Sequence, residues 1–181
     1  RGRSAAAALS PDEVRSTIAD GRGFDPAEPK VAYDSQTTQE LLARLSSWSP
    51  VVRFRAAGAL ARRPGDSVPQ LLALLASPER DARLGACHAL ELMGTRAAPA
   101  TDALLAVLAT DDAWLRIRAA YALAAIGPDA RKAAPELLRL VAKEDPADPR
   151  GTTSRYLGLA LFLDGYLDDA PERGLLADSV E

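Results

Sequence analysis

The chain has 181 residues, of which 48% are apolar and only 5% aromatic, enough for one domain with a core of its own. The single cysteine, Cys87, excludes a disulfide framework within the chain and a thiolate zinc site, and the apolar runs are far shorter than the roughly 20 residues of a membrane helix. The net charge is −3, but residues 51–163 carry fifteen bases and twelve acids, and residues 164–181 carry six acids and one base. The surplus of three positive charges over residues 51–163 is too small for dense phosphate neutralisation.

The first predicted element is a short helix over residues 11–20. Ser10 and Glu13 have the spacing of a capping box, and Pro11 suits the first helical position. A helix this short needs a surface on which to dock. A connection rich in Gly and Pro follows it. We therefore expect residues 1–36 to form an N-terminal capping or docking segment.

From residue 37 onward the sequence repeats. The dipeptide Ala-Leu begins at residues 59, 89, 122 and 160, a glycine follows each copy, and an arginine precedes the first three copies by six residues. Upstream of each copy lies a second apolar element with a Leu-Leu pair, and several of these elements begin near a proline. Because Ala and Leu are strong helix formers, each copy predicts two short helices. The expected repeat units are residues 37–66, 67–96, 97–130 and 131–165.

The second helix of the third copy shows how the units must pack. Its Leu115, Ala119, Ala122, Leu123 and Ile126 fall on one stripe, which we expect to face the first helix of the same pair. A single helix pair cannot bury both of its faces, so neighbouring pairs must stack to form the core. Asp111-Asp112 precedes this helix and is expected to cap it.

This pattern resembles the HEAT-repeat family, in particular the bacterial HEAT-like repeats of the phycobilin lyases. The resemblance covers about Thr37 to Gly165 and rests on SPVVRFRAAGAL, SPERDARLGACHAL and TDDAWLRIRAAYALAAIG. It implies an all-α fold: an α-solenoid, wound as a right-handed superhelix of about four stacked antiparallel helix pairs. It also implies a ladder of ion pairs between repeats, made by Arg53, Arg83, Arg116, Asp81 and Asp112.

The last part of the chain departs from the pattern. The fourth copy contains the insertion KEDPADPRGTT and has Ser154 where the ladder arginine is expected. Residues 166–181 are either an acidic C-terminal tail that caps the array or the start of a further repeat, because Pro171 and a Leu-Leu pair follow in the order of a first helix.

No residue pattern indicates catalysis. His88 and Glu91 can share a helix face, as an acid–base pair requires, but a solitary histidine is more often a surface or groove side chain bonded to a neighbour or to water. Cys87 is adjacent to His88, and adjacent helix positions do not face each other, so we interpret it as a small core residue. No cofactor and no metal are expected, because metal catalysis needs about three protein ligands and the chain has no repeated His-Glu pairs.

The remaining candidate is a surface. In stacked helix pairs the second helices line the concave side, and the positions opposite the packed stripe form a largely apolar groove there; part of the series could instead be ordinary helix packing. The predicted partner-binding groove consists of Phe54, Leu84, His88, Ile117, Tyr121, Arg155 and Leu159.

We therefore expect a non-catalytic scaffold whose groove binds a protein or peptide. The favoured occupant of the groove is the chain's own segment Leu9 to Tyr33; a separate protein or peptide, a second copy of the chain, or the rest of a longer parent chain are the alternatives. No membrane is expected, and a nucleic acid is disfavoured because the arginines are explained by the ladder and by solvated flanks. The alternative is an enzyme subunit of the phycobilin-lyase or DNA-glycosylase kind, which exposed indoles at Trp48 and Trp114 would favour.

Overall fold

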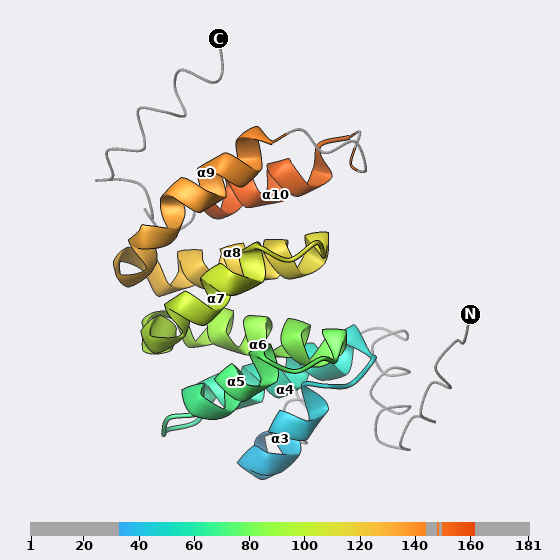
Figure 1. Cartoon of the computed structure of the whole chain (residues 1–181). Helices are drawn as coiled ribbons and strands as arrows, with labels where there is room; N and C mark the ends of the chain where they lie inside the picture. The colour runs from blue at the N-terminus through green and yellow to red at the C-terminus, as the bar shows by residue number, and fades with distance from the viewer. Residues whose placement is uncertain (1–32, 144–147, 149, 162–181) are drawn as a thin grey trace, which may run out of the picture.

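A computed structural model describes residues 33–143, 148 and 150–161, and this part is helical without a strand. It forms four helix pairs that stack in sequence order, as Figure 1 shows, so the expected all-α solenoid is confirmed. The pairs are α3 (Thr38–Arg44) with α4 (Pro50–Arg62), α5 (Val68–Leu75) with α6 (Arg80–Met93), α7 (Thr101–Leu108) with α8 (Ala113–Ile126), and α9 (Ala134–Ala142) with α10 (Thr152–Leu161). Two 3-10 segments, η1 (Gly94–Ala100) and η2 (Gly127–Ala133), connect the later pairs. The predicted helix over residues 11–20 and the segment 166–181 lie outside the described residues.

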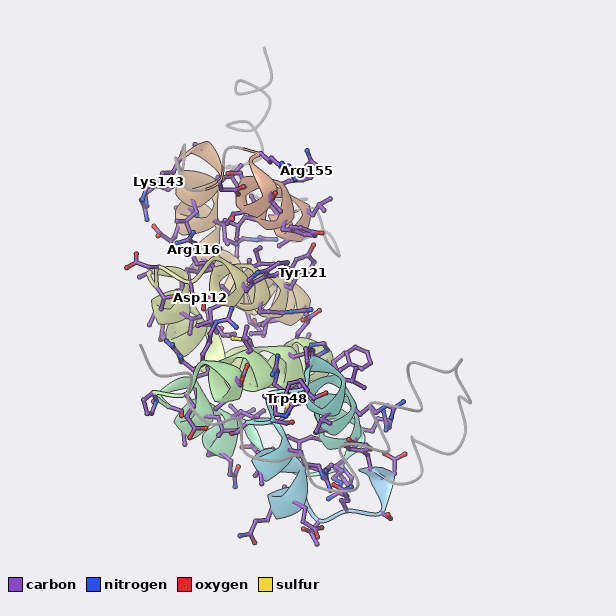
Figure 2. All side chains as sticks on the ribbon, turned by 90° about the vertical axis from the view of Figure 1, so that its right-hand side faces the viewer. Trp48, Asp112, Arg116, Tyr121, Lys143 and Arg155 are labelled. Atoms are coloured by element: carbon purple, nitrogen blue, oxygen red, sulfur yellow. The ribbon has the colours of Figure 1, made fainter. Side chains whose placement is uncertain are left out.

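The helices form two layers. The second helices of the pairs, α4, α6, α8 and α10, pack directly on one another in that order, and we call them the second-helix layer. The first helices, α3, α5, α7 and α9, each pack on their own partner and touch one another far less; they form the first-helix layer. Figure 2 shows the two layers side by side. The core lies between them and between successive second helices.

Helix α8 is buried more completely than its sequence pattern predicts. The five residues of the expected stripe are fully buried, but Ala120 and Ala124 are buried as well. The reason is that α8 contacts α7, α6 and α10 on different sides, so little of its circumference meets solvent. Ile117 is only 5% exposed, which corrects its assignment to a partner-binding groove.

The helix ends follow from local chemistry. Thr37 and Glu40 form a capping box at the start of α3, with Thr37 N–H donating to Glu40 Oε2 at 2.7 Å. The Asp112 carboxylate accepts from the backbone N–H groups of Trp114 and Leu115 at 3.0 and 3.1 Å, which confirms its capping role at α8. Glycines with positive φ, 58° and 77°, follow α6 and α8 directly.

The described chain enters the array beside the first pair. Tyr33 is buried, with the Arg44 guanidinium carbon 5.5 Å from its ring centroid. Asp34 pairs with Arg62 at the end of α4 at 2.5 Å, and Arg63 donates to the Asp34 carbonyl at 3.2 Å. Tyr33 therefore packs with the α3–α4 pair, and the rest of the segment proposed to cover the groove lies outside the described residues.

Candidate partner-binding face

The outward side of the second-helix layer carries most of the exposed large apolar side chains. Phe54 is 57% exposed, Trp114 55% and Leu159 49%, on α4, α8 and α10 respectively. In Figure 2, Tyr121 and Arg155 point from this layer in the direction away from the first helices. We call this surface the second-helix face.

An aromatic contact joins α4 to α6 on this face. The Phe54 and His88 rings meet edge to face, with centroids 4.9 Å apart and planes at 84°. Burial of His88, together with the positive charges of Arg118 and Arg53, lowers its pKa to about 4. The ring is therefore neutral at pH 7. A pKa this low does not suit a general acid or base that works near pH 7.

An ion pair joins α6 to α8 beside that contact. Arg118 Nη1 donates to Glu91 Oε2 at 3.3 Å, and the Arg118 side chain is 40% exposed. Burial raises the pKa of Glu91 above its usual value, and the Arg118 charge opposes that shift. The Glu91 carboxylate thus bonds to Arg118, whereas the sequence left Glu91 and water as alternative partners of His88.

A second aromatic contact joins α8 to α10. The Trp114 and Tyr156 ring centroids lie 6.4 Å apart with their planes at 45°. The predicted groove included neither residue. The repeat alignment placed Arg155 and Leu159 on the groove side of α10 and left out Tyr156, which follows Arg155 directly. Trp48 is also exposed, and Figure 2 places it at the other end of the array, on the first pair.

The predicted groove residues thus have different environments. Phe54, Arg155 and Leu159 are exposed, whereas Leu84, His88 and Tyr121 are partly buried. Ile117 is buried beneath them. The second-helix face therefore carries both exposed and partly buried aromatic side chains. The three contacts described above join side chains of successive helices on it.

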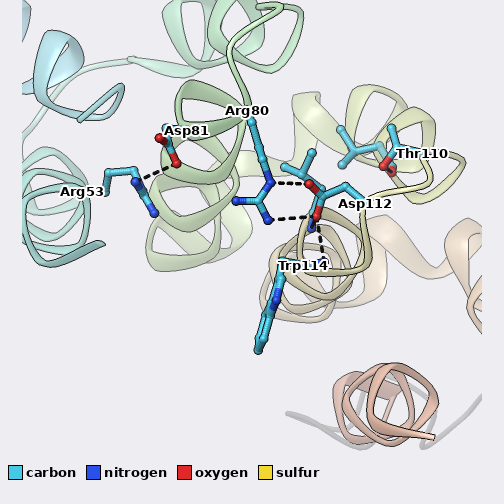
Figure 3. Close-up of polar contacts among 8 residues, drawn as sticks. Arg53, Arg80, Asp81, Thr110, Asp112 and Trp114 are labelled. Atoms are coloured by element: carbon cyan, nitrogen blue, oxygen red, sulfur yellow. Dashed lines mark hydrogen bonds and ion pairs between the residues drawn. The ribbon is translucent and has the colours of Figure 1, made fainter. Parts of the chain in front are cut away.

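Two ion pairs that involve predicted ladder residues join successive repeats, and only one of them is formed by a predicted ladder arginine. Arg53 Nη1 donates to Asp81 at 2.9 Å, which links α4 to α6 (Figure 3). The same nitrogen donates to the Ser47 carbonyl at 2.5 Å, in the turn between α3 and α4. Asp112 pairs with Arg80 through two nitrogens, one at 3.2 Å, and not with Arg83 (Figure 3).

The other two predicted ladder arginines, Arg116 and Arg83, differ in their contacts. Arg116 Nη1 donates to the Thr110 carbonyl at 3.0 Å, six residues earlier, which matches the bond from Arg53 to Ser47. Arg83 forms no ion pair with any residue that the structure describes, and its Nε is buried without a hydrogen-bond partner. Arg80, one helical turn before Arg83, forms the contact with the next repeat instead.

Burial raises the pKa of Cys87 to about 12, so its thiol stays protonated at neutral pH. Within residues 33–143, 148 and 150–161, no three His, Cys, Asp or Glu side chains are grouped to hold a metal ion. The helices of this part of the chain are all too short or too polar to cross a bilayer.

Comparison with known proteins identifies the repeats. The family model described as HEAT repeats matches twice, at residues 38–124 and 68–158. The first match spans the first three helix pairs and the second spans the last three. No curated protein and no solved structure matches the chain. The two overlapping matches together cover well over half of the sequence, and the chain belongs to the HEAT-repeat family.

Proposed function

We propose that the protein is a non-catalytic scaffold that binds a polypeptide on its second-helix face. HEAT repeats generally mediate protein–protein interactions. The observation that carries the proposal is a row of three contacts across the second helices: Phe54–His88, Arg118–Glu91 and Trp114–Tyr156. We call these six residues the cross-helix row.

The row supports binding because it carries exposed aromatic side chains at both ends and is fixed in position. Exposed apolar side chains that gather on one face favour an interaction site over a solvated surface. Each contact joins two neighbouring helices, so a partner meets side chains that already hold their places, which lowers the ordering cost of binding. The second helices also pack more closely than the first helices, which favours the inner side of a curved stack for this layer.

The same residues favour a scaffold over an enzyme. His88 is neutral and packs on Phe54, and Glu91 bonds to Arg118, so the two side chains do not form the acid–base pair that their spacing allows. The exposed indoles of Trp48 and Trp114 fit a ligand-stacking enzyme subunit as well as a protein interface. Trp114 pairs with Tyr156 across two repeats, which favours the interface.

Site-specific crosslinking tests the proposal. A photoreactive amino acid at Phe54 or Leu159 in the full chain, expressed in its source cells, should give polypeptide adducts. The matched control carries the same amino acid at Gln70, which is exposed in α5 of the first-helix layer. Adding Tyr156→Glu should reduce the adducts at both test positions. Equal adducts at Gln70, or adducts with nucleic acid alone, would count against a polypeptide site on this face.

A further inference from the structure

Positive charge is concentrated in one layer of the array. The second helices carry eight arginines and two acids, Asp81 and Glu91, whereas the first helices carry two arginines and three acids. The eight arginines are Arg53, Arg55, Arg62, Arg80, Arg83, Arg116, Arg118 and Arg155. The chain as a whole has a net charge of −3, so this asymmetry does not follow from composition. The second-helix layer therefore keeps a positive excess, also after Asp34 and Asp112, which lie outside the second helices, pair with Arg62 and Arg80, and this excess favours anions.

Two of these arginines on the second-helix face can receive a carboxylate. The Arg118 side chain is 40% exposed and gives one nitrogen to Glu91 at 3.3 Å, which leaves most of its five donors for a ligand. Arg155 is exposed on α10, and its side chain forms no hydrogen bond or ion pair with any residue that the structure describes. Both belong to the surface that carries Tyr156 and Leu159.

We propose that the polypeptide bound by this face is an acidic segment with interspersed apolar residues. The inference rests on the proposed function and adds the chemistry of the partner. Carboxylates of the segment pair with Arg118 and Arg155, while its apolar side chains pack on Phe54 at one end of the cross-helix row and on Tyr156 and Leu159 at the other. Guanidinium groups hold carboxylates through two parallel hydrogen bonds, which gives direction to an otherwise apolar contact.

The pairing of the arginines favours a protein over a nucleic acid. Arg53, Arg62, Arg80 and Arg118 already have carboxylate partners, at Asp81, Asp34, Asp112 and Glu91 respectively. Neutralising a phosphate backbone needs many unengaged cations in a regular track, whereas at least half of the eight already have an internal carboxylate partner. A few carboxylates spaced by apolar residues match the donors that Arg118 keeps beside Glu91 and the exposed Arg155.

Glu91 gives the proposal a sharp test, because it competes with the ligand for Arg118. Three labelled peptides, each with four copies of Xaa-Leu-Ser-Gly and with Glu, Gln or Lys at Xaa, are titrated into the full chain and followed by fluorescence anisotropy. The Glu peptide should bind most tightly and the Lys peptide least. Arg118→Gln and Arg155→Gln should each weaken binding of the Glu peptide by about fivefold, as expected for a partly exposed ion pair.

The remaining variants separate a specific site from general charge attraction. Glu91→Gln should tighten binding of the Glu peptide by about two- to fivefold, because it releases Arg118. Arg139→Gln, which removes an exposed arginine of α9 in the first-helix layer, should leave binding unchanged.

Three outcomes would overturn the acidic partner. If the Gln peptide binds as tightly as the Glu peptide and Leu159→Glu still weakens both, the face binds polypeptide without selecting acids. If duplex DNA binds more tightly than the Glu peptide and the same arginine variants abolish its binding, the ligand is a nucleic acid. If the chain associates with itself and Arg155→Gln disperses it, the face is occupied by a second copy.

Discussion

At the scale of single residues, the neutral state of His88 makes the stability of the fold depend on pH. Burial and the charges of Arg118 and Arg53 lower its pKa to about 4, whereas a histidine in the unfolded chain has a pKa of about 6.5. As the pH falls through this window the unfolded chain takes up the proton first, so stability present above pH 6.5 is lost as the pH falls towards 4.

We expect the wild-type chain to lose on the order of 2 kcal/mol more unfolding free energy than His88→Gln between pH 7 and pH 4, a figure reduced for the exposed part of the ring. Urea denaturation of both proteins across this range measures the difference. Burial also raises the pKa of Glu91, which acts in the opposite direction, but both proteins retain Glu91 and its contribution cancels. Identical pH profiles would show that the fold does not keep His88 neutral.

The sequence could predict which residue types bind across the repeats, but not every partner. Arg53 and Asp81 form an ion pair, as the resemblance implied. The partner of Asp112 is Arg80 and not Arg83, because both arginines lie near the start of α6 and one helical turn decides which of them reaches α8. A repeat alignment places Arg53, Arg83 and Arg116 as equivalents and gives no reason to consider Arg80.

At the scale of helices, Gly85 permits a close approach that the sequence did not indicate. A Cβ atom added at this position in α6 would lie 2.9 Å from the Leu45 carbonyl carbon and closer still to its oxygen, at the end of α3. Both neighbours are backbone atoms, so the clash can be relieved only by moving one helix.

Gly85→Ala should therefore lower the unfolding free energy by about 1–3 kcal/mol, although alanine is the better helix former. Gly158→Ala in α10 is the matched control, because a Cβ atom there meets nothing within 4 Å. The control should raise stability by about 0.5–1 kcal/mol. Chemical denaturation measures both, and a stabilised Gly85→Ala protein would contradict the close contact between α3 and α6.

The helices themselves were largely predictable, and their surroundings were not. Periodicity and the Ala-Leu, Leu-Leu and glycine spacings predict four pairs, which the structure contains. The same periodicity assigns Ile117 to an exposed side, because the hydrophobic pattern of one helix cannot show how many neighbours surround it. The Trp114–Tyr156 contact was missed for a related reason, since the pattern of α10 alone does not show that Tyr156, beside Arg155, contacts the neighbouring helix.

At the scale of the whole molecule, stacking and charge act on the same layer. The second helices supply the contacts that hold successive repeats together and also carry the excess of arginines. Ion pairs such as Arg53–Asp81 and Arg80–Asp112 use part of that charge between neighbouring repeats. The same layer therefore joins the repeats and carries the candidate site. Because each repeat contacts only its neighbours, a destabilising substitution in one repeat should weaken mainly the adjacent repeats.

That coupling can be measured by comparing a central and a terminal core leucine. Leu123 in α8 and Leu41 in α3 are both fully buried, so replacing either by alanine opens a cavity that costs about 2–5 kcal/mol locally. Because α8 contacts α6, α7 and α10, Leu123→Ala should raise amide hydrogen exchange throughout α6 to α10. Leu41→Ala should raise it mainly in α3 and α4, at one end of the stack, while α7 to α10 keep their protection. Uniform loss of protection in both variants would show a single cooperative unit, and unchanged stability of Leu123→Ala would contradict the assigned core.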